Sequence, residues 1–350
     1  MNRVLDVRSV LQDVFATDLG IEQPIERIEF IHHTRPDVYR VKAGGRSFIV
    51  HADPDERQRL RDLRFNLQRV AALADERIPH LAAWRESEAG PKWSVVVCHE
   101  IQGEELNRHN ATQHVLDSLG DLLLKIHSTS GPAESHGGPS RAFHDTRGFS
   151  AFTDALMGRL SDLPVQMSRV QRHCDEMAAY LERHAVAFDR PTGLIHADVQ
   201  RCNIIVSQDR VGLIDWGDLS GGDYAYDLGL LKFLLDSLKP RQSASFLQGR
   251  ARLYRDTFQD SSLELRLRFH LALAGLVRAF FVAGETQAFP AGRAWRVRAS
   301  YLHSEAQWRN PLRIDGERAG APAARNEDWA LDIRQPFRGL YFLLAQKRIA

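Results

Sequence analysis

Cysteine is scarce in this chain of 350 residues, which has Cys98, Cys174 and Cys202 and no others. The three lie far apart and lack paired metal-ligand spacing, which argues against both a disulfide framework and a zinc site. An excess of charge is also missing, because 46 basic and 45 acidic residues leave a net charge of +1. This balance provides no electrostatic footprint for nucleic acid or an anionic membrane. We expect neither partner, and a reducing cytoplasm fits best.

Long apolar runs are absent as well. The N-terminal residues include Asp6, Asp13 and Asp18 and lack the apolar core of a secretory signal, so we expect mature protein there. The most apolar long stretch, Leu271 to Gly284, contains Arg278 and is shorter than the roughly 20 apolar residues that span a bilayer. We expect it to be a buried helix.

The first part of the chain has the pattern of an antiparallel sheet with two helices. Hydrophobic residues make up 43% of the chain, enough to bury a sizeable core in one large or two modest domains. Helical periodicity occupies the first 20 residues and 60–74. Strands are predicted at 28–31, 38–41, 48–50 and 94–97, with a hairpin turn at 43–45.

The remainder is mainly helical. Helices are predicted at 115–126, 149–160, 167–186, 225–237, 242–258 and 262–284, interrupted by a β-hairpin of 204–206 and 211–214. The segment 311–326 is rich in Gly, Pro, Ala and Arg and indicates a linker, followed by an apolar tail. The pattern therefore predicts an α+β protein with its sheet in the N-terminal part.

Polar residues with a specific spacing flank the predicted hairpin. His196, Asp198 and Asn203 match H-x-D-x-x-x-x-N, and Asp215 follows the second strand in Ile-Asp-Trp-Gly-Asp. Taken together, this pattern resembles the catalytic half of the aminoglycoside phosphotransferase and choline kinase group. A lone H-x-D occurs by chance in many proteins, so the joint pattern carries the resemblance.

The resemblance implies a protein-kinase-like, two-lobed fold. Its small N-terminal lobe of antiparallel sheet would comprise residues 1–100, its larger helical lobe 101–310, and the linker and tail 311–350. It also implies an enzyme that transfers a phosphoryl group from ATP or GTP, with Mg²⁺, to a hydroxyl of a small molecule. The acceptor (an aminoglycoside-like antibiotic, amino alcohol, sugar or related metabolite) and the oligomeric state stay open.

Each residue type in the pattern suits phosphoryl transfer, which needs mainly positioning and neutralised charge. Asp198 can accept the proton of the substrate hydroxyl or orient that hydroxyl. Asn203 offers an amide oxygen and Asp215 a carboxylate, both hard ligands that suit Mg²⁺. His196 is predicted to hold the catalytic loop through a hydrogen bond to the backbone or to Asp215.

Weaker similarities extend to other parts of the chain. Residues 95–103, with Val97 and His99 among them, resemble the hinge whose backbone groups hold the adenine edge in this family. Gly222 to Leu228 resembles G-D-P-x-Y-D-L, in which Asp227 is predicted to anchor the catalytic loop. His127 on its own is interpreted as a satisfied core histidine.

The N-terminal lobe departs from the family pattern. His51 stands where the phosphate-binding lysine is expected and Asn66 where its partner glutamate is expected. His51, Arg35 or Arg40 could supply a donor to phosphate instead, and Arg201 in the catalytic loop is a further candidate contact to phosphate or substrate. The alternative reading is a kinase-fold protein with impaired catalysis that binds a ligand or regulates. A hydrolytic metal centre is a third reading, but it lacks further ligands close in sequence.

Overall fold

The computed structural model describes residues 2–32, 37–53, 57–86, 93–129, 146–189, 193–208, 210–284, 290–310 and 312. The chain divides into two compact units. The first unit comprises Met1–Glu104 and Ile205–Gly217, and the second comprises Glu105–Ile204 and Asp218–Ala350. The expected N-terminal lobe ended at residue 100 and did not include the hairpin, whereas the structure joins Ile205–Gly217 to it. The reason is local, because the backbone amide of Leu213 donates to the carbonyl of Arg77 at 2.9 Å. Of the expected tail, 311–350, all but Leu312 lies outside the described residues.

The first unit is built on a five-stranded antiparallel sheet in the order β1-β2-β3-β5-β4. Its elements are α1 (Asn2–Leu19), β1 (Arg27–His32), β2 (Asp37–Ala43), β3 (Arg46–Asp53), α2 (Arg57–Ala71), β4 (Leu81–Glu86) and β5 (Ser94–His99). All four predicted strands and both predicted helices are present. Strand β4 was not predicted, since its sequence Leu-Ala-Ala-Trp-Arg-Glu has low β propensity and is held by pairing with β5.

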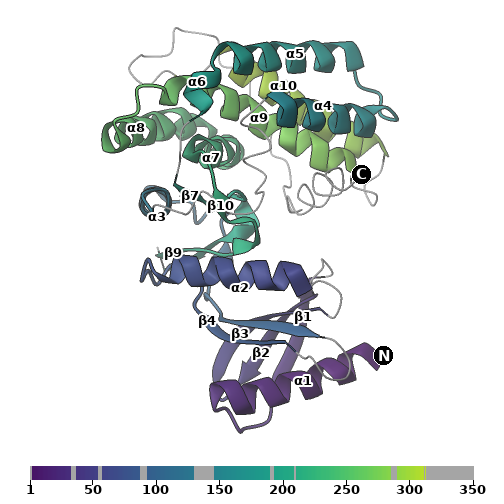
Figure 1. The fold of residues 1–350 in the computed structure, drawn as a ribbon, viewed down its shortest axis with the longest axis vertical. Coiled ribbons are helices and arrows are strands. Elements are labelled where there is room, and N and C mark those ends of the chain that lie inside the picture. The colour runs from purple at the N-terminus through teal and green to yellow at the C-terminus, as the bar shows by residue number, and fades with distance from the viewer. Residues whose placement is uncertain are drawn as a thin grey trace. The chain divides into compact units, whose positions relative to one another are not determined.

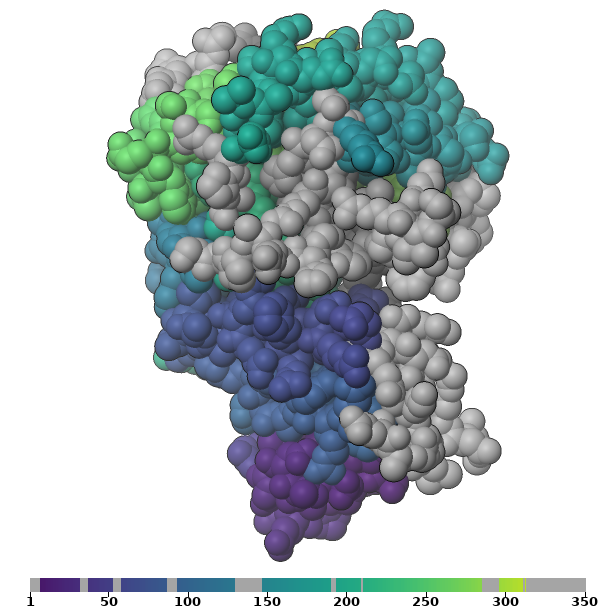
Figure 2. Space-filling view, viewed as in Figure 1, coloured from purple at the N-terminus to yellow at the C-terminus, as the bar shows by residue number. Residues whose placement is uncertain are grey.

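Helices α1 and α2 cover opposite faces of this sheet (Figure 1). On the α1 face, Phe15 packs edge-on against Phe48 with ring centroids 5.1 Å apart, and Val50 belongs to the same buried cluster. Because side chains alternate along a strand, His51 follows Val50 onto the opposite face, which α2 covers. In the space-filling view, α1 and α2 form separate parts of the surface (Figure 2).

The second unit is mainly helical, as expected. Its helices are α3 (Gln113–His127), α4 (Thr146–Leu160), α5 (Met167–Arg183), α6 (Ala185–Phe188), α7 (Tyr224–Leu238), α8 (Pro240–Phe258), α9 (Leu263–Gly284) and α10 (Pro290–Arg309). Helices α6 and α10 were not predicted. By length and composition α9 is the single described helix that could cross a membrane, and most of it is buried inside the protein. The prediction of a buried helix there is confirmed.

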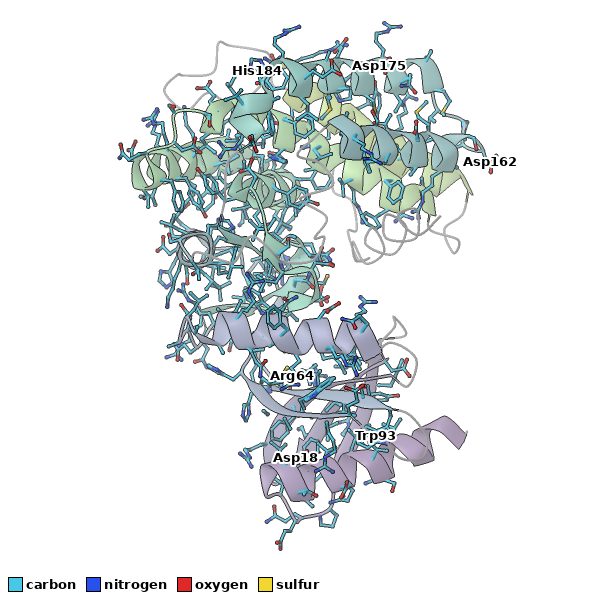
Figure 3. All side chains as sticks on the ribbon, viewed as in Figure 1. Asp18, Arg64, Trp93, Asp162, Asp175 and His184 are labelled. Atoms are coloured by element: carbon cyan, nitrogen blue, oxygen red, sulfur yellow. The ribbon has the colours of Figure 1, made fainter. Side chains whose placement is uncertain are left out.

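A buried ionic cluster joins the start of α7 to α9. The guanidinium of Arg266 donates to the carboxylates of Asp223 at 2.6 Å and Asp260 at 2.7 Å. Burial alone would raise the pKa of Asp223, but the charge of Arg266 and a hydrogen bond from His270 lower it below the ordinary range. This cluster fixes the first turn of α7, which follows directly on the catalytic sequence. By contrast, Asp175 on α5 is exposed at the surface (Figure 3).

Short strands carry the remaining functional sequence. They are β6 (Glu104–Glu105), β7 (Leu194–Ile195), β8 (Ile204–Ser207), β9 (Arg210–Leu213) and β10 (Ser220–Gly221). Strands β8 and β9 form the predicted hairpin, within a sheet of order β6-β8-β9. Strand β7 pairs antiparallel with β10, through Ile195 with Ser220 and Leu194 with Gly221.

Candidate active site

The catalytic sequence begins at a glycine that lies against another segment. A Cβ atom on Gly193 would stand 1.9 Å from the carbonyl oxygen of His127 at the end of α3. The residue is therefore glycine because the two backbones approach closely. Strand β7 follows it, and the chain then turns at Ala197, whose φ of +64° is unusual for a residue with a side chain.

Asp198 lies in this turn and is 1% exposed. Its carboxylate oxygen Oδ2 accepts hydrogen bonds from Asn203 Nδ2 at 2.7 Å and from Gln200 Nε2 at 2.8 Å. Asn203 Nδ2 also donates to the backbone carbonyl of Asp198 at 3.0 Å. These donors hold the carboxylate in one orientation, as the position of a catalytic base requires.

The same contacts determine how Asn203 is oriented. Its amide nitrogen faces Asp198, because an ionised carboxylate can only accept. The oxygen Oδ1 therefore points the other way, where the thiol of Cys202 lies 3.6 Å from it. An amide oxygen held in this way is a hard ligand of the kind that Mg²⁺ takes. The short 3₁₀ helix Arg201–Asn203 and strand β8 position it.

His196 is fully buried. Its ring nitrogen Nδ1 accepts a hydrogen bond from the backbone amide of Asp198 at 3.2 Å. Of the two predicted partners of His196, backbone or Asp215, this bond is to the backbone. The imidazole thus spans the turn that carries Asp198 and restricts its backbone.

Asp227 anchors the catalytic turn from α7. Its Oδ2 accepts from the backbone amide of His196 at 2.8 Å, and its Oδ1 from that of Ala197 at 2.9 Å. The prediction that Asp227 anchors the catalytic loop is confirmed. His127 completes the arrangement, with Nε2 at 3.0 Å from Asp227 Oδ2 and Nδ1 at 2.8 Å from the hydroxyl of Tyr254. Both ring nitrogens are satisfied, which confirms that His127 is a core histidine.

Tyr226 is a buried neighbour of these carboxylates that the sequence analysis did not single out. Burial raises its pKa well above the ordinary value, and the charges of Asp198, Asp227 and Asp218 raise it further. The phenol therefore stays protonated at neutral pH and adds no negative charge near Asp198. Gln200 was also missed, because an amide in a loop carries no signal until its partner is known.

Arg201 has a protein partner in the second unit. Its guanidinium lies 3.6 Å from the carboxylate of Glu105, and its side chain is 20% exposed. An ion pair this long and partly open to solvent contributes little to stability. The predicted contact of Arg201 with phosphate or substrate stays a prediction.

The predicted metal ligand Asp215 belongs to the first unit, in the loop after β9. Its φ is +65°, so this carboxylate also sits on a residue with left-handed backbone geometry. The indole Nε1 of the next residue, Trp216, donates to the carbonyl of Leu213 at 2.9 Å. Trp216 is 1% exposed and so fixes the loop from the buried side.

Three of the four residues predicted to bind nucleotide, His51, Val97 and His99, also lie in the first unit, whereas Arg201 belongs to the second. In β3, His51 pairs with Val38 of β2 and Val96 of β5. The Val97 side chain is buried in the core that packs on α1, and its backbone lies in the sheet between Val50 of β3 and Ala83 of β4. The backbone amide of His99 donates to the carbonyl of His80 at 3.0 Å. Contacts to nucleotide at these positions stay predictions.

Arg40 and Arg35 were the other candidate phosphate donors in this part of the chain. Arg40 Nε donates to Glu100 Oε1 at 2.7 Å, so its guanidinium is engaged in an ion pair beside β5. Arg35 lies outside the described residues.

After the predicted hinge, Gly103 has a φ of +148°, and a Cβ there would stand 2.5 Å from the carbonyl oxygen of Val206. The hinge sequence thus ends at a position that only glycine fills.

Within the described ranges, no three or more His, Cys, Asp or Glu side chains are grouped so that they could hold a metal ion. A magnesium–nucleotide site needs only one or two protein ligands, because phosphates and water supply the others.

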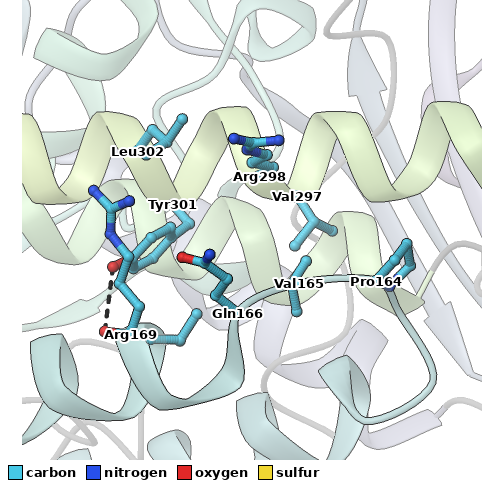
Figure 4. Close-up of a pocket in the computed structure, with 9 residues that line it drawn as sticks. Pro164, Val165, Gln166, Arg169, Val297, Arg298, Tyr301 and Leu302 are labelled. Carbon is cyan, nitrogen blue, oxygen red and sulfur yellow. Dashed lines mark hydrogen bonds between the residues drawn. The ribbon is translucent and has the colours of Figure 1, made fainter.

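A pocket of about 280 Å³ lies between α5 and α10, where the Tyr301 hydroxyl donates to the carbonyl of Arg169 (Figure 4). None of the predicted site residues lines it.

The family model "Phosphotransferase enzyme family" matches residues 27–269, which is more than half of the chain. The chain belongs to this family. The resemblance to this family, drawn from the pattern between His196 and Asp215, is thereby confirmed. The predicted kinase-like α+β fold is confirmed as well. No curated protein matches this phosphotransferase in sequence.

Solved structures show the same fold for the phosphotransferase. A thermostable mutant of aminoglycoside phosphotransferase APH(4)-Ia, in its apo form, matches with a TM-score of 0.56 and 16% identity over 85% of this chain and 98% of its own. Another structure of that enzyme is a ternary complex with AMP-PNP and hygromycin B. Amicoumacin kinase hAmiN, in complex with AMP-PNP, Ca²⁺ and Ami, matches with a TM-score of 0.57 and 14% identity over 88% of this chain and 96% of its own. At these identities the likeness shows the fold.

Proposed function

We propose that this phosphotransferase transfers the γ-phosphoryl group of ATP to a hydroxyl of a small molecule in the cytoplasm. The observation that carries the proposal is the geometry at Asp198, whose carboxylate is held by Asn203 and Gln200 in the turn after β7. A buried carboxylate oriented by two amide donors suits a group that receives a hydroxyl proton.

In the proposed reaction, Asp198 accepts the proton of the substrate hydroxyl or orients it. The hydroxyl oxygen forms a bond to the γ-phosphorus while the bond from that phosphorus to the β,γ-bridging oxygen breaks, and ADP leaves. His196 and Asp227 keep the turn rigid, so that Asp198 needs no reorganisation when the substrate binds.

We propose Asn203 and Asp215 as ligands of Mg²⁺, since each carries a hard oxygen of the kind that this ion takes, and Mg²⁺ would neutralise the charge of the phosphates when bound. Asn203 would contribute its amide oxygen, which the hydrogen bond to Asp198 directs away from that carboxylate. Asp215 would contribute a carboxylate. We propose His51 as a donor to phosphate, since strand alternation puts it on the α2 face of the sheet. The backbone at Val97 and His99 is proposed for the adenine edge.

ATP is proposed over GTP because two relatives in fold were solved with the ATP analogue AMP-PNP. Those structures contain hygromycin B and Ami, so hydroxylated antibiotics head the acceptor screen. Amino alcohols and sugars follow in the same screen. Transfer to any acceptor would be followed as ADP release.

Calorimetric titration with MgATP and MgGTP is the first test, with the Asp215→Asn variant alongside. We expect MgATP to bind with a Kd between micromolar and submillimolar, and the Mg²⁺-dependent part of the affinity to be lost in the variant. Folded protein that binds neither nucleotide would contradict the proposal. It would favour a kinase-fold protein that binds another ligand or regulates, consistent with the absence of the lysine and glutamate at His51 and Asn66.

A further inference from the structure

Asn66 is the residue predicted to stand in place of the glutamate of a Lys–Glu ion pair. In the structure it lies within α2 and is 6% exposed. Its amide nitrogen Nδ2 donates to the backbone carbonyl of Trp216 at 3.0 Å and to that of Gly217 at 3.3 Å. All three residues belong to the first unit. Asn66 thus connects α2 directly to the loop that carries Asp215.

The two carbonyls are the next ones along the chain after Asp215. The indole of Trp216 reaches back past Asp215 and donates to the carbonyl of Leu213, which precedes Asp215, at 2.9 Å. Asp215 therefore stands between two fixed points, and its φ of +65° is a geometry that an unrestrained loop seldom keeps. Both connections restrain the backbone that carries its carboxylate.

We propose that Asn66 is a positioning residue for Asp215. The inference rests on the proposed role of Asp215 as a metal ligand. Residues that orient a metal ligand without touching the metal typically change its affinity by about 10- to 100-fold when they are replaced. Asn66 would act in this way through two neutral hydrogen bonds, in place of the charged contact that the family pattern has at this helix.

The chemistry of the side chain explains why an amide stands here. A primary amide has two N–H donors, and the carbonyls of Trp216 and Gly217 can only accept. An ionised carboxylate has no donor, so a glutamate would leave both carbonyls without this partner and place a negative charge beside them. An amide at position 66 can therefore satisfy these carbonyls, which a carboxylate cannot do.

The first measurement tests the loop itself by hydrogen exchange of the full chain. The variant is Asn66→Leu, which is close in size but has no donor, and its matched control is Gln68→Leu, an exposed amide on the same helix. We expect the amides of residues 215–218 to exchange about 10-fold faster in Asn66→Leu while the strands of the sheet keep their protection. Equal exchange in the two variants would overturn the proposal. If Asn66→Leu does not fold, the isosteric Asn66→Asp is measured instead.

The second measurement tests the consequence for the metal, with ATP and Mg²⁺ as probes. The ratio of the ATP Kd without Mg²⁺ to the Kd with Mg²⁺ is expected to fall about 10-fold in Asn66→Leu and Asn66→Asp. It should stay within twofold of wild type in Gln68→Leu, and recover in part in Asn66→Gln, which keeps both donors. ATP affinity without Mg²⁺ should change little, which a general loss of structure would not produce.

Rebuilding the ion pair gives the sharpest contrast. If Asn66 works as a donor, the double variant His51→Lys/Asn66→Glu will have a lower Mg²⁺-dependent ratio than His51→Lys alone. A higher ratio in the double variant would overturn the proposal. Wild-type protein without any Mg²⁺-dependent ATP binding would overturn the proposed function and with it the role for metal. The exchange measurement still decides independently whether Asn66 holds the loop.

Discussion

The carboxylate of Asp227 accepts a hydrogen bond from the backbone amide of Ala197 at 2.9 Å, across 30 residues of chain. Ala197 has a left-handed backbone, with a φ of +64°. Such a conformation persists when surrounding contacts over-determine it. Asp227 and its second bond, to the amide of His196, provide those contacts in the turn that presents Asp198.

Replacing Asp227 with asparagine should therefore destabilise the protein. The amide can accept from one backbone N–H, but its own NH₂ group would face the other. We expect the free energy of unfolding to fall by about 3 kcal/mol, the scale of losing hydrogen bonds to a buried charged group. Urea unfolding measures this, with Asp175→Asn on the exposed face of α5 as the control. If the free energy of unfolding falls by less than about 1 kcal/mol, the turn at Ala197 and Asp198 keeps its conformation without Asp227.

Asp198→Asn should slow transfer strongly while leaving nucleotide binding in place. General-base catalysis contributes about 10²- to 10⁴-fold, so we expect kcat to fall by that factor. The asparagine is isosteric and the MgATP Kd should change less than about threefold. Transfer to an acceptor from the screen and calorimetry with MgATP measure the two quantities. Transfer at the wild-type rate would remove Asp198 from the reaction.

Gly193→Ala and Gly158→Ala should have opposite effects on stability. The new Cβ at position 193 would overlap the carbonyl oxygen of His127, at 1.9 Å, and two backbones would have to separate. We expect a loss of about 3 kcal/mol. Gly158 lies in α4 with no atom within 4 Å of an added Cβ, so alanine should stabilise by about 0.5–1 kcal/mol. Thermal unfolding of both variants would show the contrast, and equal effects would contradict it.

Acid should weaken the packing of α5 against α10 through His173. Its Nε2 lies 2.8 Å from the Ser304 hydroxyl, and burial lowers its pKa to about 4, with Glu305 raising and Arg309 lowering it by smaller amounts. The unfolded histidine has a pKa of about 6.5, so as the pH falls below that value the unfolded state binds the proton first. The contribution to stability is complete above about pH 6.5 and is lost progressively towards pH 4.

The protonation of His173 should lower the free energy of unfolding of the protein by about 2 kcal/mol between pH 7 and pH 5. His173→Asn should show a pH dependence that is smaller by that amount, since asparagine does not titrate. Urea unfolding at pH 8, 7 and 5 measures this free energy. The free energy of unfolding of the wild type should change little between pH 8 and pH 7. Identical slopes for the two proteins below pH 7 would mean that His173 does not titrate as expected.

The elements that the sequence predicted have strong patterns of their own. Two such patterns are the β-branched runs of β2 and β3 and the apolar stripes of α3 and α9. They can be recognised in the sequence because burial of one face makes apolar residues recur at the period of a strand or a helix. Strand β4 was missed, since Ala and Trp in Leu81–Glu86 become a strand only through pairing with β5. Helix α10 was missed too, and its contacts are mostly with α9.

By itself the sequence predicted the family and the fold class, because His196, Asp198, Asn203 and Asp215 match the spacing of a known pattern, and the catalytic roles of these four residues stay predictions. Only the tertiary structure decided what Gln200, Asp227 and Asn66 touch. Their partners are a carboxylate within the turn, backbone amides 30 and 31 residues away, and carbonyls 150 and 151 residues away. A hydrogen bond depends on distance in space and leaves no period in the chain. For that reason Asn66 resembles a lost glutamate in the sequence, whereas in the folded protein it is a donor.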